Sequence, residues 1–143
     1  MATVDLLALV RKLDDALAGG DLNAVREQVA AGAEWILPGR HPLAGRKRGP
    51  EEVVAYHRLL NKGGVRLEPV SLDAIDAETV VKIQHATGTA PGGVGLDSME
   101  LLVYRIEAGK VSRVETFLGD QHPVDLFYWA AFRLKPIPDC LSE

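Results

Sequence analysis

The sequence predicts an α+β fold in which three N-terminal helices cover one face of a curved sheet. Apolar residues recur three or four positions apart before Gly63, which is the spacing of amphipathic helices. From Val65 onward they alternate with polar residues, which is the spacing of strands. Helices first and antiparallel strands afterwards favour helices packed against one side of a sheet. The length of 143 residues suits one domain, so we expect a single domain over residues 1–143.

The first two helices are expected close to the N-terminus. The segment from Leu6 to Leu17 places its large apolar residues on one face and its charged residues on the other. Thr3 is expected to cap its start and Gly19-Gly20 to end it. Asp21 is expected to cap a second, shorter helix that ends at Gly32.

A short strand, a loop and the third helix follow. The apolar run at residues 35–37 predicts the strand, and Pro38 ends it because proline cannot donate a sheet hydrogen bond. The loop at residues 38–49 contains His41 and several basic residues, and we expect it to be solvated or to bind an anionic group of a substrate. Pro50 suits a first helical turn and predicts the start of the third helix.

The rest of the chain predicts strands joined by turns. The glycine-rich segment at residues 90–95 predicts a flexible hairpin loop, and residues 107–110 predict a tight one. Four strands are expected, at residues 65–72, 79–87, 96–106 and 111–118.

Composition excludes several classes of protein. Apolar residues make up 47% of the chain, charged residues 25%, and the mean hydropathy is +0.02, as in ordinary globular proteins. The net charge of −4 argues against nucleic acid and anionic membranes as partners. No basic leader and no long apolar run is evident, so we expect no signal peptide and no membrane span. We expect a cytoplasmic protein.

No cofactor and no metal is expected. Cys140, the single cysteine, cannot form an internal disulfide, and it fits a reducing compartment. The histidines lack the spacing of common zinc motifs. The glycines of the hairpin loop at residues 92–95 precede no helix, so they do not indicate a nucleotide site.

Several patterns fall in an order that resembles a known family. They are the segment at residues 43–49 before the third helix, the turn at residues 108–111 and the run at residues 119–127. Together they resemble the SnoaL-like (polyketide cyclase-like) branch of the nuclear transport factor 2-like superfamily, over Leu6 to Trp129. The resemblance implies a cone, in which a strongly curved antiparallel or mixed sheet wraps around a pocket that the helices close.

Two characterised activities of that superfamily lack their residues in this chain. By the resemblance, the catalytic positions of ketosteroid isomerase fall at Leu13, Leu37 and Ser98, none of which supplies its tyrosine or carboxyl groups. The Asp-Arg-Asp set of limonene epoxide hydrolase falls near Ile83, His85 and Thr116. We therefore expect neither of these two activities as such.

Strand alternation sorts the candidate site residues into two faces. The resemblance implies that Leu96, Ser98, Glu100, Leu102 and Tyr104 face the pocket. The comparable sets are expected to be Val81, Ile83, His85 and Thr87 on the preceding strand, and Val114, Thr116 and Leu118 on the following one.

Asp120, His85 and Glu100 are the expected catalytic residues. An apolar cavity raises a carboxyl pKa, and a histidine beside a carboxylate titrates near neutrality, so His85 with Asp120 or with Glu100 can shuttle a proton. The expected substrate-binding residues are Trp35, Leu37, Tyr56, His57, Leu102, Tyr104, Thr116 and His122.

Each catalytic candidate has a structural alternative. Asp120 can cap the segment that follows it, and His85 can be a half-buried sheet histidine. Glu100 can pair with an arginine on a neighbouring strand, and His57 can belong to the core or the surface. The residues leave these alternatives open.

The sequence favours a cofactor-free enzyme that acts on a hydrophobic polyketide-, terpenoid- or steroid-like molecule. Its acid–base chemistry would be isomerisation, aldol-type cyclisation or epoxide opening. The alternative is a non-catalytic small-molecule-binding protein or an accessory subunit of a biosynthetic pathway. We also expect a homodimer through the convex sheet face, which carries apolar residues at Met99, Leu101, Val103 and Phe117.

Overall fold

The computed structural model describes residues 5–132 and contains four helices and six strands within them. The helices are α1 (Leu6–Gly19), α2 (Leu22–Gln28), α3 (Gly49–Lys62) and α4 (Gln121–Ala131). The strands are β1 (Val29–Leu37), β2 (Gly45–Arg48), β3 (Arg66–Ala74), β4 (Thr79–Thr89), β5 (Gly95–Glu107) and β6 (Lys110–Leu118).

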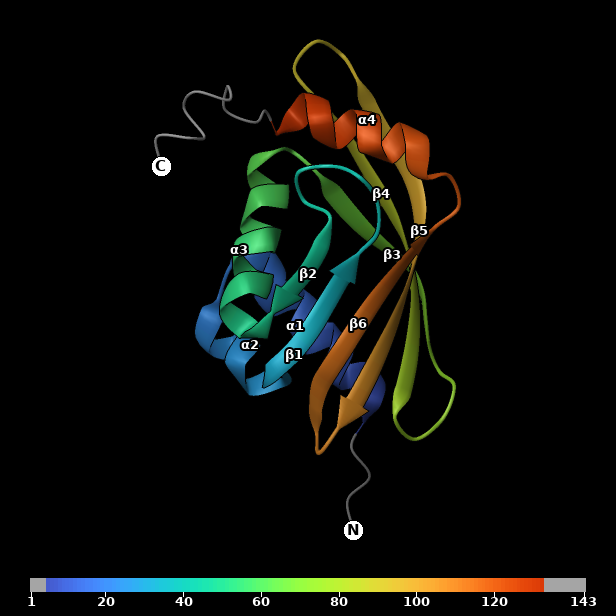
Figure 1. Cartoon of the computed structure of the whole chain (residues 1–143). Coiled ribbons are helices and arrows are strands. Elements are labelled where there is room, and N and C mark those ends of the chain that lie inside the picture. Colours follow the sequence, from blue (N-terminus) through green and yellow to red (C-terminus); the bar gives the residue numbers. More distant parts are fainter. Residues whose placement is uncertain (1–4, 133–143) are drawn as a thin grey trace.

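The strands form one mixed sheet in the order β2-β1-β6-β5-β4-β3. All neighbouring strands are antiparallel except β1 and β6, which are parallel. The sheet is strongly curved and unclosed, with α1, α2 and α3 on its concave side (Figure 1). The expected α+β cone is confirmed.

A fourth helix covers one end of the cone, in addition to the three N-terminal ones. α4 crosses the end of the sheet near β4 and β5 (Figure 1). It buries Val124, Phe127 and Tyr128. Phe127 packs on Gly88 of β4, where an added Cβ would lie 3.2 Å from the phenyl ring. Gly88 therefore gives α4 room to dock closely on the strand.

The helix boundaries near the N-terminus differ from the prediction. Asp5 caps α1 by accepting a hydrogen bond from the Ala8 amide, whereas Thr3 lies outside the described residues. Asp21 caps α2 as expected. However, α2 ends at Gln28 and not at Gly32, because Val29 already pairs with Val111 of β6. Sheet pairing thus overrides the helical spacing at this point.

The loop between β1 and α3 contains an edge strand that the sequence did not predict. Residues 45–48 form β2 and pair with residues 34–37 of β1. His41 in the same loop is buried and its ring stacks on that of Tyr128, with centroids 4.4 Å apart. The expectation of a solvated loop is wrong for His41, which packs against α4, whereas Arg40, Arg46 and Arg48 are exposed.

None of the helices within residues 5–132 is long and apolar enough to cross a membrane. Cys140 lies outside these residues.

Candidate functional site

The sheet register decides which side chains face the helices. Glu100 of β5 pairs with Gln84 of β4 and with Leu118 of β6. Leu102 pairs with Lys82 and Thr116 in the same way. Because paired residues point to the same face of a sheet, Lys82 and Gln84 share the concave face with Glu100. Both are buried.

This register corrects the expected orientation of β4. His85 pairs with Met99, and Ile83 pairs with Leu101, so both lie on the convex face. The prediction turned the apolar residues Val81 and Ile83 toward the pocket. In the structure the polar residues Lys82 and Gln84 point inward instead.

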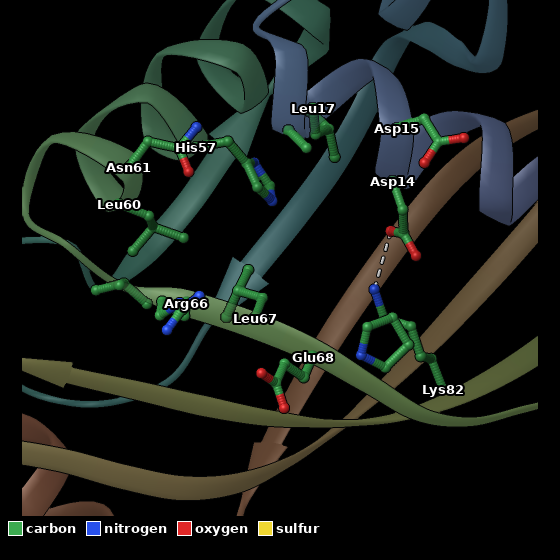
Figure 2. Close-up of a pocket in the computed structure, with 13 residues that line it drawn as sticks. Asp14, Asp15, Leu17, His57, Leu60, Asn61, Arg66, Leu67, Glu68 and Lys82 are labelled. Atoms are coloured by element: carbon green, nitrogen blue, oxygen red, sulfur yellow. Dashed lines mark hydrogen bonds and ion pairs between the residues drawn. The ribbon is translucent and has the colours of Figure 1, made fainter.

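The concave face carries a pocket that is open at one end. Its mouth has a volume of about 480 Å³ and lies between α1, α3, β3 and β4. That volume is in the usual range for small-molecule sites. Figure 2 shows the mouth, with the His57 ring projecting from α3 into it. The lining residues are Asp14, Asp15, Leu17, Ala18, His57, Leu60, Asn61, Val65, Arg66, Leu67, Glu68, Pro69 and Lys82.

A narrow inner chamber adjoins the mouth. Its volume is about 10 Å³, which is room for a single water-sized group. His57, Leu60 and Leu67 line both spaces and therefore stand at the boundary between them. The other lining residues are Trp35, Tyr56, Gln84, Glu100, Leu102, Thr116 and Tyr128.

Glu100 is the carboxyl group of the inner chamber. It is 5% exposed, and burial raises its pKa above the ordinary value, although the Gln84 hydrogen bond and the Lys82 charge oppose the rise. Gln84 Nε2 donates to Glu100 Oε1 at 2.7 Å, which fixes the carboxyl group in the chamber. A carboxylate whose pKa is raised is a stronger base than an ordinary one, which suits it to take up a proton and return it.

His57 contributes an imidazole in a single tautomer. Its Nδ1 lies 2.9 Å from the Val53 carbonyl oxygen, and since a carbonyl only accepts, Nδ1 must carry the proton. Burial lowers the His57 pKa to about 4. At neutral pH the ring is therefore uncharged, and Nε2 is a hydrogen-bond acceptor. Edge contacts with Trp35 and Tyr56, both with centroids 4.9 Å away, hold the ring in place.

Lys82 and Asp14 form an ion pair in the mouth. Lys82 Nζ lies 2.9 Å from Asp14 Oδ1, and the pair joins β4 to α1 (Figure 2). Burial raises the Asp14 pKa, while the Lys82 ammonium opposes the rise. Neither residue was identified from the sequence.

Most expected substrate-binding residues lie in or next to the inner chamber. Trp35, Tyr56, His57, Leu102 and Thr116 line it. Leu37 and Tyr104 are buried in the core and line none of the three pockets found in the described residues. The ring of Tyr104 packs on Trp35, at a centroid distance of 6.0 Å.

Asp120, His85 and His122 lie away from this pocket. Asp120 is exposed at the N-terminus of α4 and lines a separate hollow of about 240 Å³, together with Asp97. His85 is half-buried on the convex face and is hydrogen-bonded to the Asp97 carboxylate. His122 is exposed on α4. The expected pairing of His85 with Glu100 is not formed.

Many residues of the pocket were not expected from the sequence, among them Asp14, Lys82, Gln84 and Tyr128. The position of Gln84 could have been predicted from the hairpin that follows β4. In a hairpin closed by Thr89 and Gly95, a residue five positions before Thr89 pairs with the residue five positions after Gly95, which places Gln84 opposite Glu100. Asp14 and Tyr128 had no such signal, because their positions depend on how α1 and α4 pack.

Within residues 5–132, no cluster of three or more His, Cys, Asp or Glu side chains has the arrangement of a metal site.

Comparisons with known proteins agree with this fold. Residues 10–114 match the model of the SnoaL-like domain. An uncharacterized protein of Mycobacterium tuberculosis is 30% identical over 127 residues, which cover 87% of this chain and 95% of the relative.

Two solved structures are similar over most of their length. A nuclear transport factor 2-like protein of Burkholderia xenovorans superposes with a TM-score of 0.77 at 22% identity, covering 90% of this chain and 98% of the other. A Sinorhizobium meliloti protein proposed to be a polyketide cyclase gives a TM-score of 0.62 at 20% identity, with coverages of 82% and 100%. The domain match, the relative and the cone around a pocket place this chain in the SnoaL-like family of nuclear transport factor 2-like proteins.

Proposed function

We propose that this protein is a cofactor-free enzyme that moves a proton on a hydrophobic small molecule. The single observation that carries the proposal is Glu100, a buried carboxyl group with a raised pKa that lines a chamber beside the neutral imidazole of His57. Perturbed groups gathered in a cleft are typical of acid–base sites. The proposed reactions are isomerisation, aldol-type cyclisation or epoxide opening on a polyketide-, terpenoid- or steroid-like compound.

The inner chamber and the mouth hold different parts of the substrate in this proposal. The inner chamber admits one small group of the substrate, whereas the mouth holds the rest of the molecule. A group entering the chamber passes His57, which lines both spaces. This arrangement brings one reacting atom beside Glu100 and leaves little room for competing water.

Each polar group of the chamber has a role in the proposed reaction. Glu100 takes the proton and returns it to another atom of the substrate. His57 Nε2 accepts a hydrogen bond from a substrate hydroxyl, since a ring with a pKa of about 4 is a weak base. Burial raises the pKa of Tyr56 and Tyr128, so their hydroxyl groups stay protonated and can donate.

A Glu100→Gln variant tests the proposal. Glutamine keeps the shape of the side chain and cannot shuttle a proton, so turnover of enolisable ketones or epoxides is expected to fall roughly 10²- to 10⁴-fold, with ligand affinity nearly unchanged. Glu107→Gln, in the exposed β5–β6 turn, is the matched control and retains activity. Equal turnover of Glu100→Gln and the control would contradict the proposal.

A non-catalytic binding protein is the second candidate. The observation that favours it is the small volume of the inner chamber, which holds no more than a water-sized group. In that case Glu100→Gln would change ligand affinity, and neither wild type nor variant would turn over any of the compounds that bind.

We further propose that two copies associate through the convex sheet face. Met99 is 49% exposed and Phe117 is 47% exposed, and Leu101 and Ile83 lie beside them. A gathering of large apolar side chains on one sheet face is typical of an interface. The mass measured by light scattering is expected to be that of a dimer for wild type and of a monomer for Phe117→Asp. A monomeric wild type would contradict this.

The site uses no resident cofactor in this proposal, and the cytoplasm is the compartment that we propose. Immunodetection in fractionated cells of the source organism tests the location.

A further inference from the structure

Lys82 is a buried cation that the proposed proton transfer has not yet used. Its side chain is 5% exposed although it points from β4 into the pocket. The ammonium group lies 5.5 Å from the centre of the Tyr104 ring, over its face. Lysine is rarely buried unless its charge is compensated, so the groups that compensate the charge of Lys82 must be identified.

Asp14 compensates the charge of Lys82 but does not use all its hydrogen bonds. An ammonium group has three N–H donors. Within residues 5–132, Asp14 is the one side chain or backbone group that accepts a hydrogen bond from Lys82 Nζ. Lys82 lines the mouth, so its remaining donors are available to a ligand bound there.

The charges around the mouth argue against a ligand with a permanent negative charge. Three carboxyl groups, from Asp14, Asp15 and Glu68, share the lining with the cations Lys82 and Arg66. A carboxylate or phosphate would meet more repulsion than attraction there. A neutral oxygen that acquires charge only during the reaction would meet no such repulsion on binding, and could still accept from Lys82.

We propose that Lys82 binds the carbonyl oxygen of the substrate and stabilises the negative charge that forms on it. This proposal rests on the proposed function and names its substrate class as ketones and related compounds with a C–H bond next to a carbonyl group. Fixed donors aimed at a developing oxyanion in a dry site are among the strongest contributions to catalysis.

The proposed step needs no other reactant. The Glu100 carboxylate takes a proton from the carbon next to the carbonyl group. The electron pair of that C–H bond becomes the carbon–carbon double bond of an enolate, and the carbonyl π pair moves to the oxygen beside Lys82. In a ketone with a carbon–carbon double bond at the β,γ position the enolate is a dienolate, and Glu100 returns the proton to its γ-carbon while the oxygen pair re-forms the carbonyl group, which gives the conjugated isomer. Alternatively, the enolate carbon attacks a second carbonyl group of the same molecule, and the new alkoxide takes the proton from Glu100, which gives an aldol ring.

Asp14 acts as a positioning residue in this proposal. Its contact with Nζ holds the ammonium group at one place in the mouth, and its negative charge limits how strongly Lys82 attracts an anion. Removing that charge while keeping the side-chain shape, as in Asp14→Asn, should therefore make the site a stronger binder of anions.

A phenol whose ionisation is visible tests the proposal without relying on turnover. 4-Nitrophenol is titrated into the full-length protein, and the absorbance of its phenolate reports the ionised fraction of the bound probe. We expect the ionisation constant of the bound phenol to fall at least tenfold when Lys82 is lost. Asp14→Asn is expected to raise it.

One double variant keeps the test decisive if single substitutions unfold the protein. Lys82→Met/Asp14→Leu removes both charges and leaves no unpaired one, and circular dichroism checks its fold. The Asp14 charge is absent both from this double variant and from Asp14→Asn, so an ionisation constant equal in these two variants would overturn the proposal, as would absence of saturable binding to wild type.

Glu100→Gln separates this inference from the proposed function. It is expected to keep the effect of Lys82 on the probe while losing turnover. A lysine effect together with undiminished turnover in Glu100→Gln would refute the role of Glu100 alone, whereas lost turnover without any lysine effect would refute the role of Lys82 alone.

Discussion

The two faces of the sheet carry the same kinds of residue in different surroundings. On the concave face, Glu100 is 5% exposed and lines a chamber beside His57. On the convex face, His85 is hydrogen-bonded to Asp97, whose side chain is 85% exposed. A carboxyl group and an imidazole therefore line one dry space on the concave side, whereas on the convex side they are hydrogen-bonded to each other at the surface.

The acid–base behaviour of these groups therefore depends more on their burial than on the residue type. Solvent screens the convex pair and competes for its hydrogen bonds, so it contributes little to stability. Burial shifts the pKa of Glu100 upward and that of His57 downward, in both cases toward the uncharged form. The Glu100 shift follows from the register that turns Glu100 toward the helices, and the His57 shift follows from the burial of that side chain on α3.

The largest change in the free energy of unfolding is expected at the buried ion pair on the concave side. Lys82→Met leaves Asp14 buried without its partner, so the free energy of unfolding should fall by about 3 kcal/mol. Lys82→Met/Asp14→Leu should recover most of that loss, because it leaves no unpaired charge. Urea denaturation measures both values. A single variant as stable as wild type would contradict the burial of this pair.

His57 should make the protein less stable in acid. Its pKa is about 4 in the folded protein and 6.5 when unperturbed, so the unfolded chain takes up the proton first as the pH falls. Its contribution is complete above pH 6.5 and is lost on acidification toward pH 4, by roughly 3 kcal/mol. Denaturation of wild type and His57→Phe at several pH values measures this loss.

The matched control for this acid effect is His122→Gln, which changes an exposed histidine. It should follow the wild-type curve, while His57→Phe should lose roughly 3 kcal/mol less over the same interval. Parallel curves for His57→Phe and wild type would show that His57 takes up its proton equally easily in the folded and unfolded states.

The smallest effects are expected on the convex face and at the start of α4. His85→Gln and Asp97→Asn should each change the free energy of unfolding by less than about 0.5 kcal/mol. Turnover by His85→Gln and Asp120→Asn should stay within about twofold of wild type, since both residues lie outside the pocket. A tenfold loss of turnover in either variant would indicate that the catalytic site lies outside the pocket, near the substituted residue.

The cone could be predicted from the sequence, because spacing and turn residues act locally. The boundaries of α3 and of the tight turn after β5 agree with Pro50 and with residues 107–110. The inward face of β5 also agrees with the expectation that Glu100 and Leu102 face the pocket. β2 was missed because its sequence is mostly basic and its partner strand was predicted too short.

The candidate site was only partly predictable, since apolar alternation does not distinguish the inner face of this sheet. The convex face exposes Ile83 and Met99, while the pocket contains Lys82 and Gln84. Hydrophobicity therefore assigned β4 the wrong way round. The contact between Lys82 and Asp14, which lie 68 residues apart in the chain, depends on how α1 docks on the sheet.

Titration of the Glu100 carboxyl group tests the central claim most directly. Carbon-13 NMR of glutamate-labelled protein, with the Glu100 signal assigned by its absence in Glu100→Gln, measures its pKa in the folded state. The account predicts a value above the ordinary 4.5, because burial outweighs the Gln84 hydrogen bond and the Lys82 charge. A value at or below 4.5 would contradict this, since the Gln84 hydrogen bond and the Lys82 charge would then offset burial completely and leave Glu100 no stronger a base than an ordinary carboxylate.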